Sequence, residues 1–185
     1  MGTLKTTNIQ TITGSGTLTL GTSGETLTVP TGVTVGGGMS NTPAFQASLS
    51  TGSSQTIPSA TYTKAILSNE HFDTDNAYNT SNGRFTVPTG KGGKYHVMAV
   101  SFIDDIDNLT VSQIRIYKNS SATTNPVLQV SAFGSGGSQN WYIGISQTLT
   151  LAESDYIEMF VYQGTSTDQN LRSTSSFSAY RLIGV

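Results

Sequence analysis

The dipeptide Asn82-Gly83 places the strongest constraint on how this chain can fold. Asparagine and glycine both accept the positive φ that a tight hairpin turn needs. The turn leads into an aromatic and β-branched run at 84–87, and Pro88 ends that run because proline lacks a backbone donor. A glycine-rich step then leads to a second run that begins at Tyr95. This order predicts a β-hairpin with a structural role and no catalytic group in it.

The composition is that of a β-rich chain with few charges. Of the 185 residues, 11% are charged, against roughly 25% in an average globular domain. The length suits one domain plus an appendage. A net charge of −2 gives no basic field, so we expect no nucleic-acid partner. The sequence has no cysteine, and no apolar run approaches the ~18 residues of a membrane span, so we expect neither disulfides nor membrane insertion.

The first 38 residues differ from the rest, because they hold two charged residues, Lys5 and Glu25, and no aromatic one. Three alternating runs in this segment would each direct their apolar side chains to one side as short strands. One copy would bury too little apolar surface to offset the entropy of ordering, so we expect several copies around a common axis. A disordered tail is the alternative. The predicted stalk residues are Leu18, Leu20, Leu27, Val29, Val33 and Val35.

We therefore divide the chain into an N-terminal anchoring and stalk segment at 1–38, a linker at 39–42 and a head domain at 43–185. The head reads as about ten strands joined by turns, which favours an all-β sandwich or jelly roll. Two of these strands carry bulky apolar groups on both faces, so we expect their second face to be covered. The clearest strands are 43–49, 84–87, 94–102, 110–118, 126–133, 142–151, 156–163 and 175–183, and the two-sided ones are 94–102 and 156–163.

The segment at 72–95 resembles the globular head of the complement first component, a jelly roll of the tumour-necrosis-factor-like superfamily. In that family an aromatic residue, an Asn-containing loop, a Tyr, a Gly-x-Phe strand and a Gly-x-Tyr strand follow one another at this spacing. The resemblance covers about residues 43–185 and implies a jelly-roll head that packs as a homotrimer. The further segments that carry the resemblance are 43–47, 114–119, 149–157 and 175–183.

Two positions depart from the family pattern. Glu153-Ser154 stands where the family has Gly before an Asp, and Ala179 stands where Gly is usual in the last strand. These departures bear on the predicted conformation of the local turn and leave the predicted fold unchanged.

The opening residues 4–10, followed by Thr-Leu-Thr-Leu and Thr-Val-Pro-Thr-Gly units, resemble the N-terminal parts of phage structural proteins. With the stalk and the trimeric head, this resemblance implies a phage fibre or spike in the virion, assembled in the host cytoplasm. The N-terminus would dock onto another virion protein, and the head would attach to a host-surface glycan or protein. One alternative is a capsid decoration or cement protein without receptor binding. Another is a polysaccharide-degrading spike, which needs two carboxylates about 5–9.5 Å apart.

The loops of the head hold the candidate contact residues. Loop aromatics commonly serve as partner contacts, so we predict receptor contacts at Trp141 and Tyr142, with Asp168 and Asn170 in a second loop. Packing of Trp141 at a subunit interface or at the core edge is the alternative.

The loop at 104–108 is the candidate for an ion site, with Asp104, Asp105 and Asp107 as the carboxylates that would hold a structural calcium ion. It fails the EF-hand spacing, and a solvated acidic loop is the alternative. We expect no other cofactor. The sequence has no nucleophile elbow, phosphate-binding loop, HExxH motif or Cys/His cluster, so we expect no catalytic residues and no enzymatic activity.

Overall fold

The computed structural model describes residues 41–106, 111–119, 125–134 and 139–183, together with Thr26 and Thr31; the side chains of 104–106 and 139 are not included. The chain divides into two units, Met1–Gly36 and Gly37–Val185, and every described strand belongs to the second. The predicted stalk residues lie outside the described residues. The strands are β1 (Ala44–Ser48), β2 (Ser54–Ile57), β3 (Thr63–Lys64), β4 (Asn69–Asp73), β5 (Tyr78–Asn79), β6 (Arg84–Thr86), β7 (Gly93–Ile106), β8 (Val111–Lys118), β9 (Leu128–Phe133), β10 (Gln139–Leu151), β11 (Tyr156–Gln163), β12 (Gln169–Arg172) and β13 (Ser176–Arg181).

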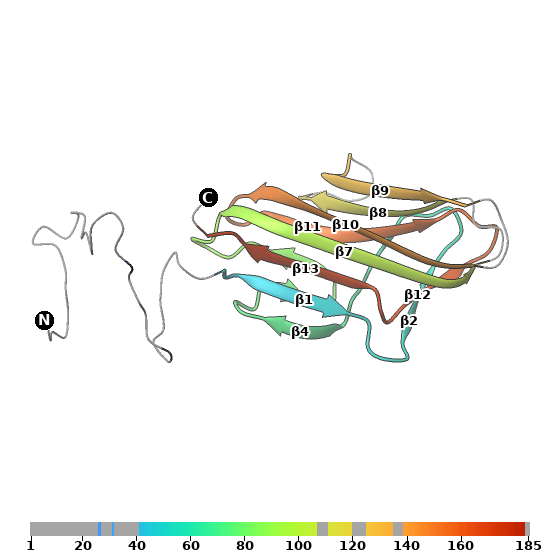
Figure 1. The fold of residues 1–185 in the computed structure, drawn as a ribbon, viewed down its shortest axis with the longest axis horizontal. Coiled ribbons are helices and arrows are strands. Elements are labelled where there is room, and N and C mark those ends of the chain that lie inside the picture. Colours follow the sequence, from blue (N-terminus) through green and yellow to red (C-terminus); the bar gives the residue numbers. More distant parts are fainter. Residues whose placement is uncertain are drawn as a thin grey trace, which may run out of the picture. The chain divides into compact units, whose positions relative to one another are not determined.

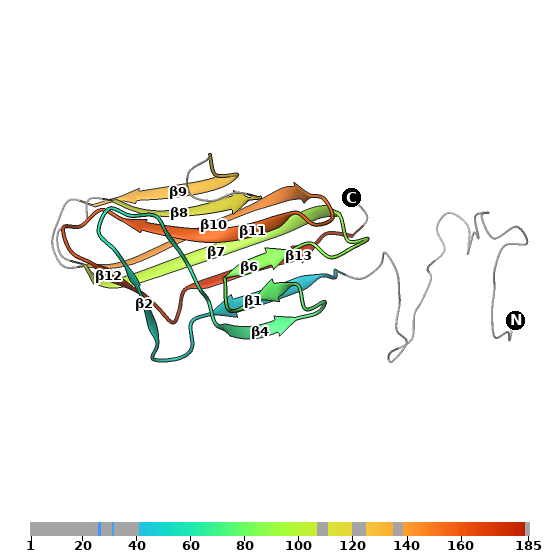
Figure 2. The same ribbon diagram turned by 180° about the vertical axis from the view of Figure 1, so that it is seen from behind.

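The strands form two antiparallel sheets that make the two layers of a jelly roll (Figures 1 and 2). The larger sheet has the order β2-β12-β7-β13-β1-β4, and β10 pairs with the other side of β7. The smaller sheet has the order β5-β6-β11-β8-β9, and the short β3 also pairs with β11. None of the described residues is helical, so no helix among them could cross a membrane. The predicted all-β class is confirmed for the described part of the chain.

A cluster of aromatic rings joins the two sheets. The ring of Phe45 on β1 stacks on Tyr78 and Phe85 of the smaller sheet, with centroids 4.7 and 4.8 Å away. It also meets the edge of Phe177 on β13 at 5.2 Å. Phe45 and Phe85 are fully buried, and burying such side chains is the main favourable term in folding.

The structure contains all eight of the clearest predicted strands, seven of them with shifted ends and β11 with the predicted bounds, together with five short strands that the sequence did not reveal: β2, β3, β4, β5 and β12. The Asn82-Gly83 hairpin is present between β5 and β6, but four residues connect its strands, and the amides of both turn residues donate to the carbonyl of Asn79. Gly83 alone of the two has positive φ, at 66°. The turn is therefore longer than the dipeptide indicates.

The expected cover of the second face is present on β11, but it comes from the same chain and not from the second subunit that the resemblance implies. Its outward residues are covered within the same chain: Phe160 is 7% exposed and meets the ring edge of Tyr117 at 5.1 Å, and Tyr162 lies 4.7 Å from the ring of Tyr62. The outward Glu158 is 2% exposed. A second subunit is therefore not needed to cover this strand, because β3 pairs beside it and the side chains of Tyr62 and Lys64 lie against its outward ones.

The turn between β10 and β11 accommodates the departure from the family pattern. Ser154 adopts a φ of 67°, the conformation that glycine takes most easily. The Asp155 carboxylate accepts hydrogen bonds from the Ala152 amide at 2.6 Å and from Asn119 Nδ2 at 2.5 Å, and it pairs with Lys118 Nζ at 2.7 Å. Burial alone would raise the pKa of Asp155, but these bonds together lower it.

We expect Gly83→Ala to destabilise the head more than Gly52→Ala. Both glycines have positive φ, which costs an L-residue about 1–2 kcal/mol. A Cβ at position 83 would also lie 2.3 Å from the Ala65 carbonyl oxygen, whereas a Cβ at position 52 meets nothing within 4 Å. The clash should add about 1–3 kcal/mol to the loss in free energy of unfolding, measured by urea denaturation. Equal losses for the two variants would contradict the close approach.

We expect the effect of Asp155→Asn on stability to depend on pH. Because folding lowers the pKa of Asp155, the carboxylate contributes stability above the unfolded value of about 3.9, and this is lost as pH falls through the folded pKa. The variant should lose about 1–2 kcal/mol at pH 7, and the gap to the parent should close near pH 2. Denaturation at several pH values measures it. Asp168→Asn, which removes a carboxylate with one backbone N–H partner, is the control. A gap that is independent of pH would refute the assignment.

Candidate functional site

The outward side of the larger sheet carries exposed apolar side chains. Along β7, Tyr95 and Val97 point into the core and are fully buried, whereas Met98, next in the alternation, is 43% exposed. Across the neighbouring strands the partners of Met98 are small and polar: Ser146 on β10 and Ser178 on β13. We name these outward side chains the apolar face: Gln46, Phe72, His96, Met98, Val100, Phe102, Tyr142 and Tyr180.

Two aromatic pairs organise the apolar face. Phe102 and Tyr142 are cross-strand partners on β7 and β10, and their rings stack with centroids 3.9 Å apart and an interplanar angle of 7°. Tyr142 nonetheless remains 59% exposed. The rings of His96 and Tyr180 lie 5.5 Å apart. Rings held in this way are oriented before a partner arrives, which lowers the entropy cost of binding.

The apolar face carries little charge. Among the outward side chains of β7 between Gly93 and Phe102, Lys94 is the single lysine, arginine, aspartate or glutamate. The two histidines of the chain both lie on this side of the sheet, His96 on β7 and His71 on the edge strand β4. Protein–protein interfaces are depleted of charge at their centres. The composition of the apolar face therefore suits contact with another protein surface.

A serine–histidine pair lies at the edge of this face and was not evident from the sequence. Ser48 Oγ is 2.9 Å from His71 Nε2, and Asn69 Nδ2 donates to the same oxygen at 3.3 Å. A nucleophilic serine needs a base that a third group orients. Among the described residues no carboxylate bonds to His71, so the pair connects β1 to β4 and does not form a triad.

The outward side of the smaller sheet holds cations over aromatic rings. The guanidinium of Arg84 lies 3.7 Å from the ring centroid of Tyr156, that of Arg115 lies 3.8 Å from Tyr62, and Lys64 Nζ lies 5.9 Å from Phe160. Lys64 and Arg84 both bond to Glu158 Oε1, at 2.7 and 2.8 Å. We name these residues the cation–aromatic cluster: Tyr62, Lys64, Arg84, Arg115, Tyr156, Glu158 and Phe160.

Arg115 differs from the other two cations because it has no carboxylate partner among the described residues. Its Nη1 donates to the Tyr117 hydroxyl at 3.2 Å, and its buried Nε has no partner there. The Tyr62 hydroxyl donates to Gln113 Oε1. Burial raises the pKa of Tyr62, and the positive charge of Arg115 partly opposes that rise.

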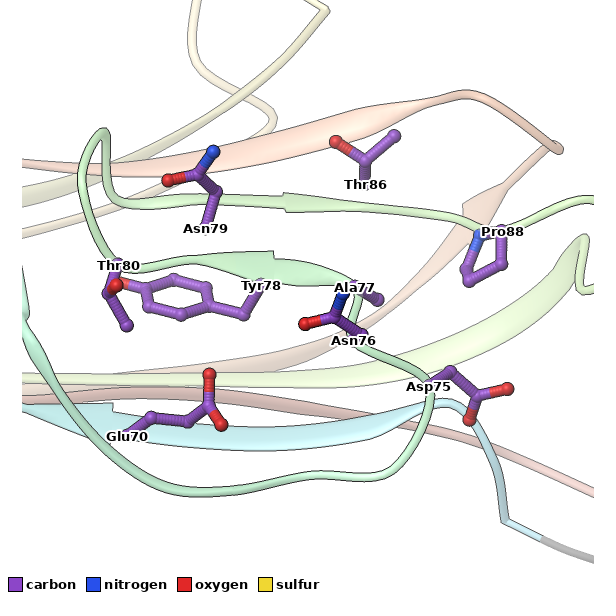
Figure 3. A pocket seen from close by; sticks show the side chains of 9 residues that line it. All are labelled: Glu70, Asp75, Asn76, Ala77, Tyr78, Asn79, Thr80, Thr86 and Pro88. Carbon is purple, nitrogen blue, oxygen red and sulfur yellow. The ribbon is translucent and has the colours of Figure 1, made fainter.

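A pocket of about 550 Å³ lies along β4 and β5 and the loop between them (Figure 3). Burial raises the pKa of Tyr78 at its wall, and the charge of Glu70 adds to this effect. Asp75 in the lining pairs with Lys91 at 3.5 Å. The lining combines carboxylates, carboxamides and hydroxyls and defines no single ligand class: Glu70, Asp75, Asn76, Ala77, Tyr78, Asn79, Thr80, Thr86 and Pro88.

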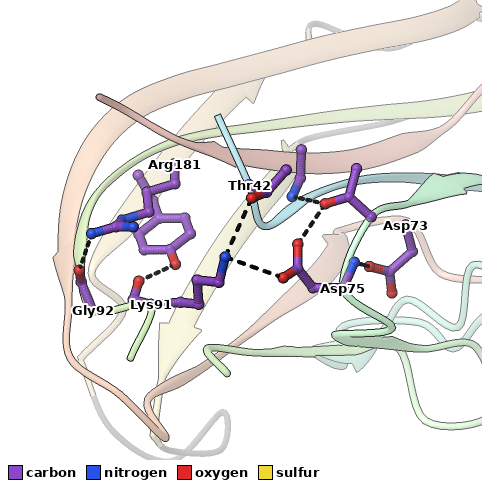
Figure 4. A network of polar contacts seen from close by, with 9 residues as sticks. Thr42, Asp73, Asp75, Lys91, Gly92 and Arg181 are labelled. Carbon is purple, nitrogen blue, oxygen red and sulfur yellow. Dashed lines mark hydrogen bonds and ion pairs between the residues drawn. The ribbon is translucent and has the colours of Figure 1, made fainter. Parts of the chain in front are cut away.

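A polar network anchors the start of the head next to this pocket (Figure 4). Lys91 Nζ contacts Thr42 Oγ1 at 3.4 Å as well as Asp75, and the Ala44 amide donates to Thr74 Oγ1 at 3.0 Å. Burial raises the pKa of the nearby Tyr95 to about 12, although the charge of Arg181 opposes the rise. The network joins three segments that are distant in sequence.

The predicted contact residues occupy different surroundings. Trp141 pairs with Ile103 and packs against the core, with its Nε1 buried, whereas Tyr142 points outward on the apolar face. Asp168 is exposed and accepts from the Ser59 amide at 3.1 Å, and Asn170 lies on β12 opposite Thr56. Their role in receptor binding stays a prediction.

The calcium prediction falls largely outside the described part of the chain. Asp104 and Asp105 belong to β7, but their side chains are not described, and Asp107 lies beyond the described residues. Within the described residues, no three acidic or histidine side chains gather to hold a metal.

Comparison with known proteins shows the fold. No family model matches the chain, and no curated protein matches it. The globular domain of the zebrafish complement 1qA protein aligns with 76% of this chain and 97% of its own length, at 17% identity and a TM-score of 0.56. The Eiger TNF of S. frugiperda aligns with 77% of this chain and 93% of its own length, at 11% identity and a TM-score of 0.53. The head therefore has the jelly-roll fold of the complement and tumour-necrosis-factor proteins, as the sequence resemblance predicted.

Proposed function

We propose that the head forms a homotrimer through the apolar face and serves as a non-enzymatic attachment module. The observation that carries this proposal is the apolar face itself, where Met98, Tyr142 and Phe72 are 43%, 59% and 47% exposed in the single chain. Large exposed apolar patches mark interaction sites on soluble proteins. Fully burying one such side chain is worth about 1.5–3 kcal/mol, so covering the set in three copies would be strongly favourable.

Two observations support a further copy of the same face as the partner of the apolar face: the fold of the head and the low charge of the face. The resemblance of the head to the complement and tumour-necrosis-factor jelly roll implies packing of three copies through one sheet. The apolar face lies on the larger sheet, and its low charge lets like surfaces approach without repulsion. Cyclic homo-oligomers are the usual way to bury such a patch.

The setting we propose is a phage virion. The support for it is the N-terminal sequence resemblance together with the predicted stalk. In this setting the N-terminus docks onto another virion protein, and three identical heads convert weak contacts with a host-surface glycan or protein into durable attachment.

We expect Met98→Glu to convert the trimer into single chains. The substitution places three carboxylates in the centre of the apolar face, where they would be desolvated and repel one another. Sedimentation equilibrium should give three chains per particle for the parent and one for the variant. Phe133→Glu is the matched control, because Phe133 is 76% exposed on β9 of the smaller sheet and should not affect assembly. A parent protein that sediments as a single chain would refute the trimer.

We expect labelled antibodies against the head to mark tail appendages in electron micrographs of the phage particle. Labels at capsid symmetry axes, with infectivity retained after deletion, would indicate a decoration or cement protein instead.

Incubation of the purified protein with host polysaccharide should leave the chain length of the polysaccharide unchanged. Shortening of the chains would establish a degrading spike.

A further inference from the structure

The cation–aromatic cluster carries an excess of positive charge in a chain whose net charge is negative. The cluster has three cations and one carboxylate, Glu158, which binds Lys64 and Arg84 and leaves Arg115 without a carboxylate partner among the described residues. Glu158 is 2% exposed, so it does not present its charge to solvent. The outward side of the smaller sheet therefore offers cations and not anions to an incoming ligand.

Arg115 is the cation in this cluster that is placed to receive an anion. Its guanidinium lies 3.8 Å from the ring centroid of Tyr62 and bonds to the Tyr117 hydroxyl. Stacking and this bond hold the planar group in one orientation, and arginine binds carboxylates through two parallel hydrogen bonds. No described carboxylate satisfies it, and the side chain is half-buried, where a charge pair is stronger than in open water.

The neighbours of Arg115 have the chemistry that binds hydroxyl groups and sugar rings. Gln129 lies opposite Arg115 on β9, and Gln113 lies two residues away on β8, opposite Ser131. Tyr162 pairs with Gln113 from β11, and its ring lies 4.7 Å from that of Tyr62. The Tyr62 hydroxyl donates to Gln113 Oε1, so the amide nitrogen of Gln113 is the group left to donate to a ligand hydroxyl, and the half-exposed tyrosine rings present apolar surface beside it.

We propose that Arg115, with the rings of Tyr62 and Tyr162 and the amides of Gln113 and Gln129, forms a binding site for an acidic saccharide. The sugar carboxylate pairs with the guanidinium, a sugar face packs on the tyrosine rings, and the amides bond to ring hydroxyls. A nucleic acid fits less well, because phosphate-backbone binding draws on several free cations. In the cluster, two of the three cations are bound to Glu158.

The site adds a ligand class, an acidic saccharide, to the proposed attachment function. It rests on that function for its biological setting only. Every residue of the site belongs to one chain and lies on the smaller sheet or, for Tyr62, directly before its strand β3, away from the apolar face. A single head could therefore bind the saccharide, and a trimer would present three sites and gain avidity.

The test measures binding of a galacturonate hexamer to the full chain by calorimetry at low salt, with the methyl-esterified hexamer as neutral probe. We expect the acidic hexamer to bind, the ester to bind at least about tenfold more weakly, and binding to weaken with added NaCl. Arg115→Gln should lower affinity for the acid at least about tenfold. Arg115→Lys should lower it less, because the charge remains without the planar fork. Arg172→Gln, on β12 of the other sheet, is the control and should stay within about twofold.

Equal binding of acid and ester, no binding of the acid, or an unchanged affinity of Arg115→Gln would overturn the site. A DNA hexamer that displaces the galacturonate hexamer at equal concentration, and that no longer binds Arg115→Gln, would assign the surface to nucleic acid. That result would overturn the proposal of a saccharide site. Thermal melting checks that each variant folds. If Arg115→Gln does not fold, the affinity of Arg115→Lys for the acidic hexamer tests the site instead. Sedimentation of the same samples separates the two proposals, because loss of the site leaves three chains per particle, and loss of the trimer leaves the site.

Discussion

The ring cluster around Phe45 is the interaction on which the rest of the structure depends. Phe45 and Phe177 come from the larger sheet, and Tyr78 and Phe85 come from the smaller one, so a single group of contacts fixes the two layers against each other. Strand alternation then determines everything outside the core. Along each strand, alternate side chains point into the core between the two sheets, so the side chains between them point outward.

The two outward sides that result have different chemistry. The larger sheet presents Met98 and stacked rings with little charge, which suits a surface like itself. On the smaller sheet, Tyr62 and Lys64 lie against Tyr162 and Phe160 of β11, and Arg115 lies beside them with its guanidinium against Tyr62. One fold thus separates a surface suited to assembly from a surface suited to a charged ligand, and neither needs to change for the other to act.

The sequence predicted what is local and missed what is distant. The long strands follow from alternation within each run, as in β7, so they could be read directly. The cover of β11 could not be read, because Tyr62 and Lys64 lie almost a hundred residues before Phe160 and Tyr162 and show no strand pattern. The sequence predicts Trp141 in a loop, but β10 begins at Gln139, so Trp141 follows the alternation of Ile143 and packs against the core. Arg115 looked like an ordinary strand residue, and only the fold brings Tyr62 over its guanidinium.

The neighbouring positions of β1 and β13 have a practical consequence. Ala44 pairs with Tyr180, and the Arg181 amide donates to the carbonyl of Pro43, so the head begins and ends on adjacent strands, about 5 Å apart. A short peptide could therefore join the two ends, and the polypeptide could be reopened elsewhere to give a circular permutant with the same core. Cargo fused after the last strand would emerge beside the start of β1 and leave the opposite rim of the sandwich accessible.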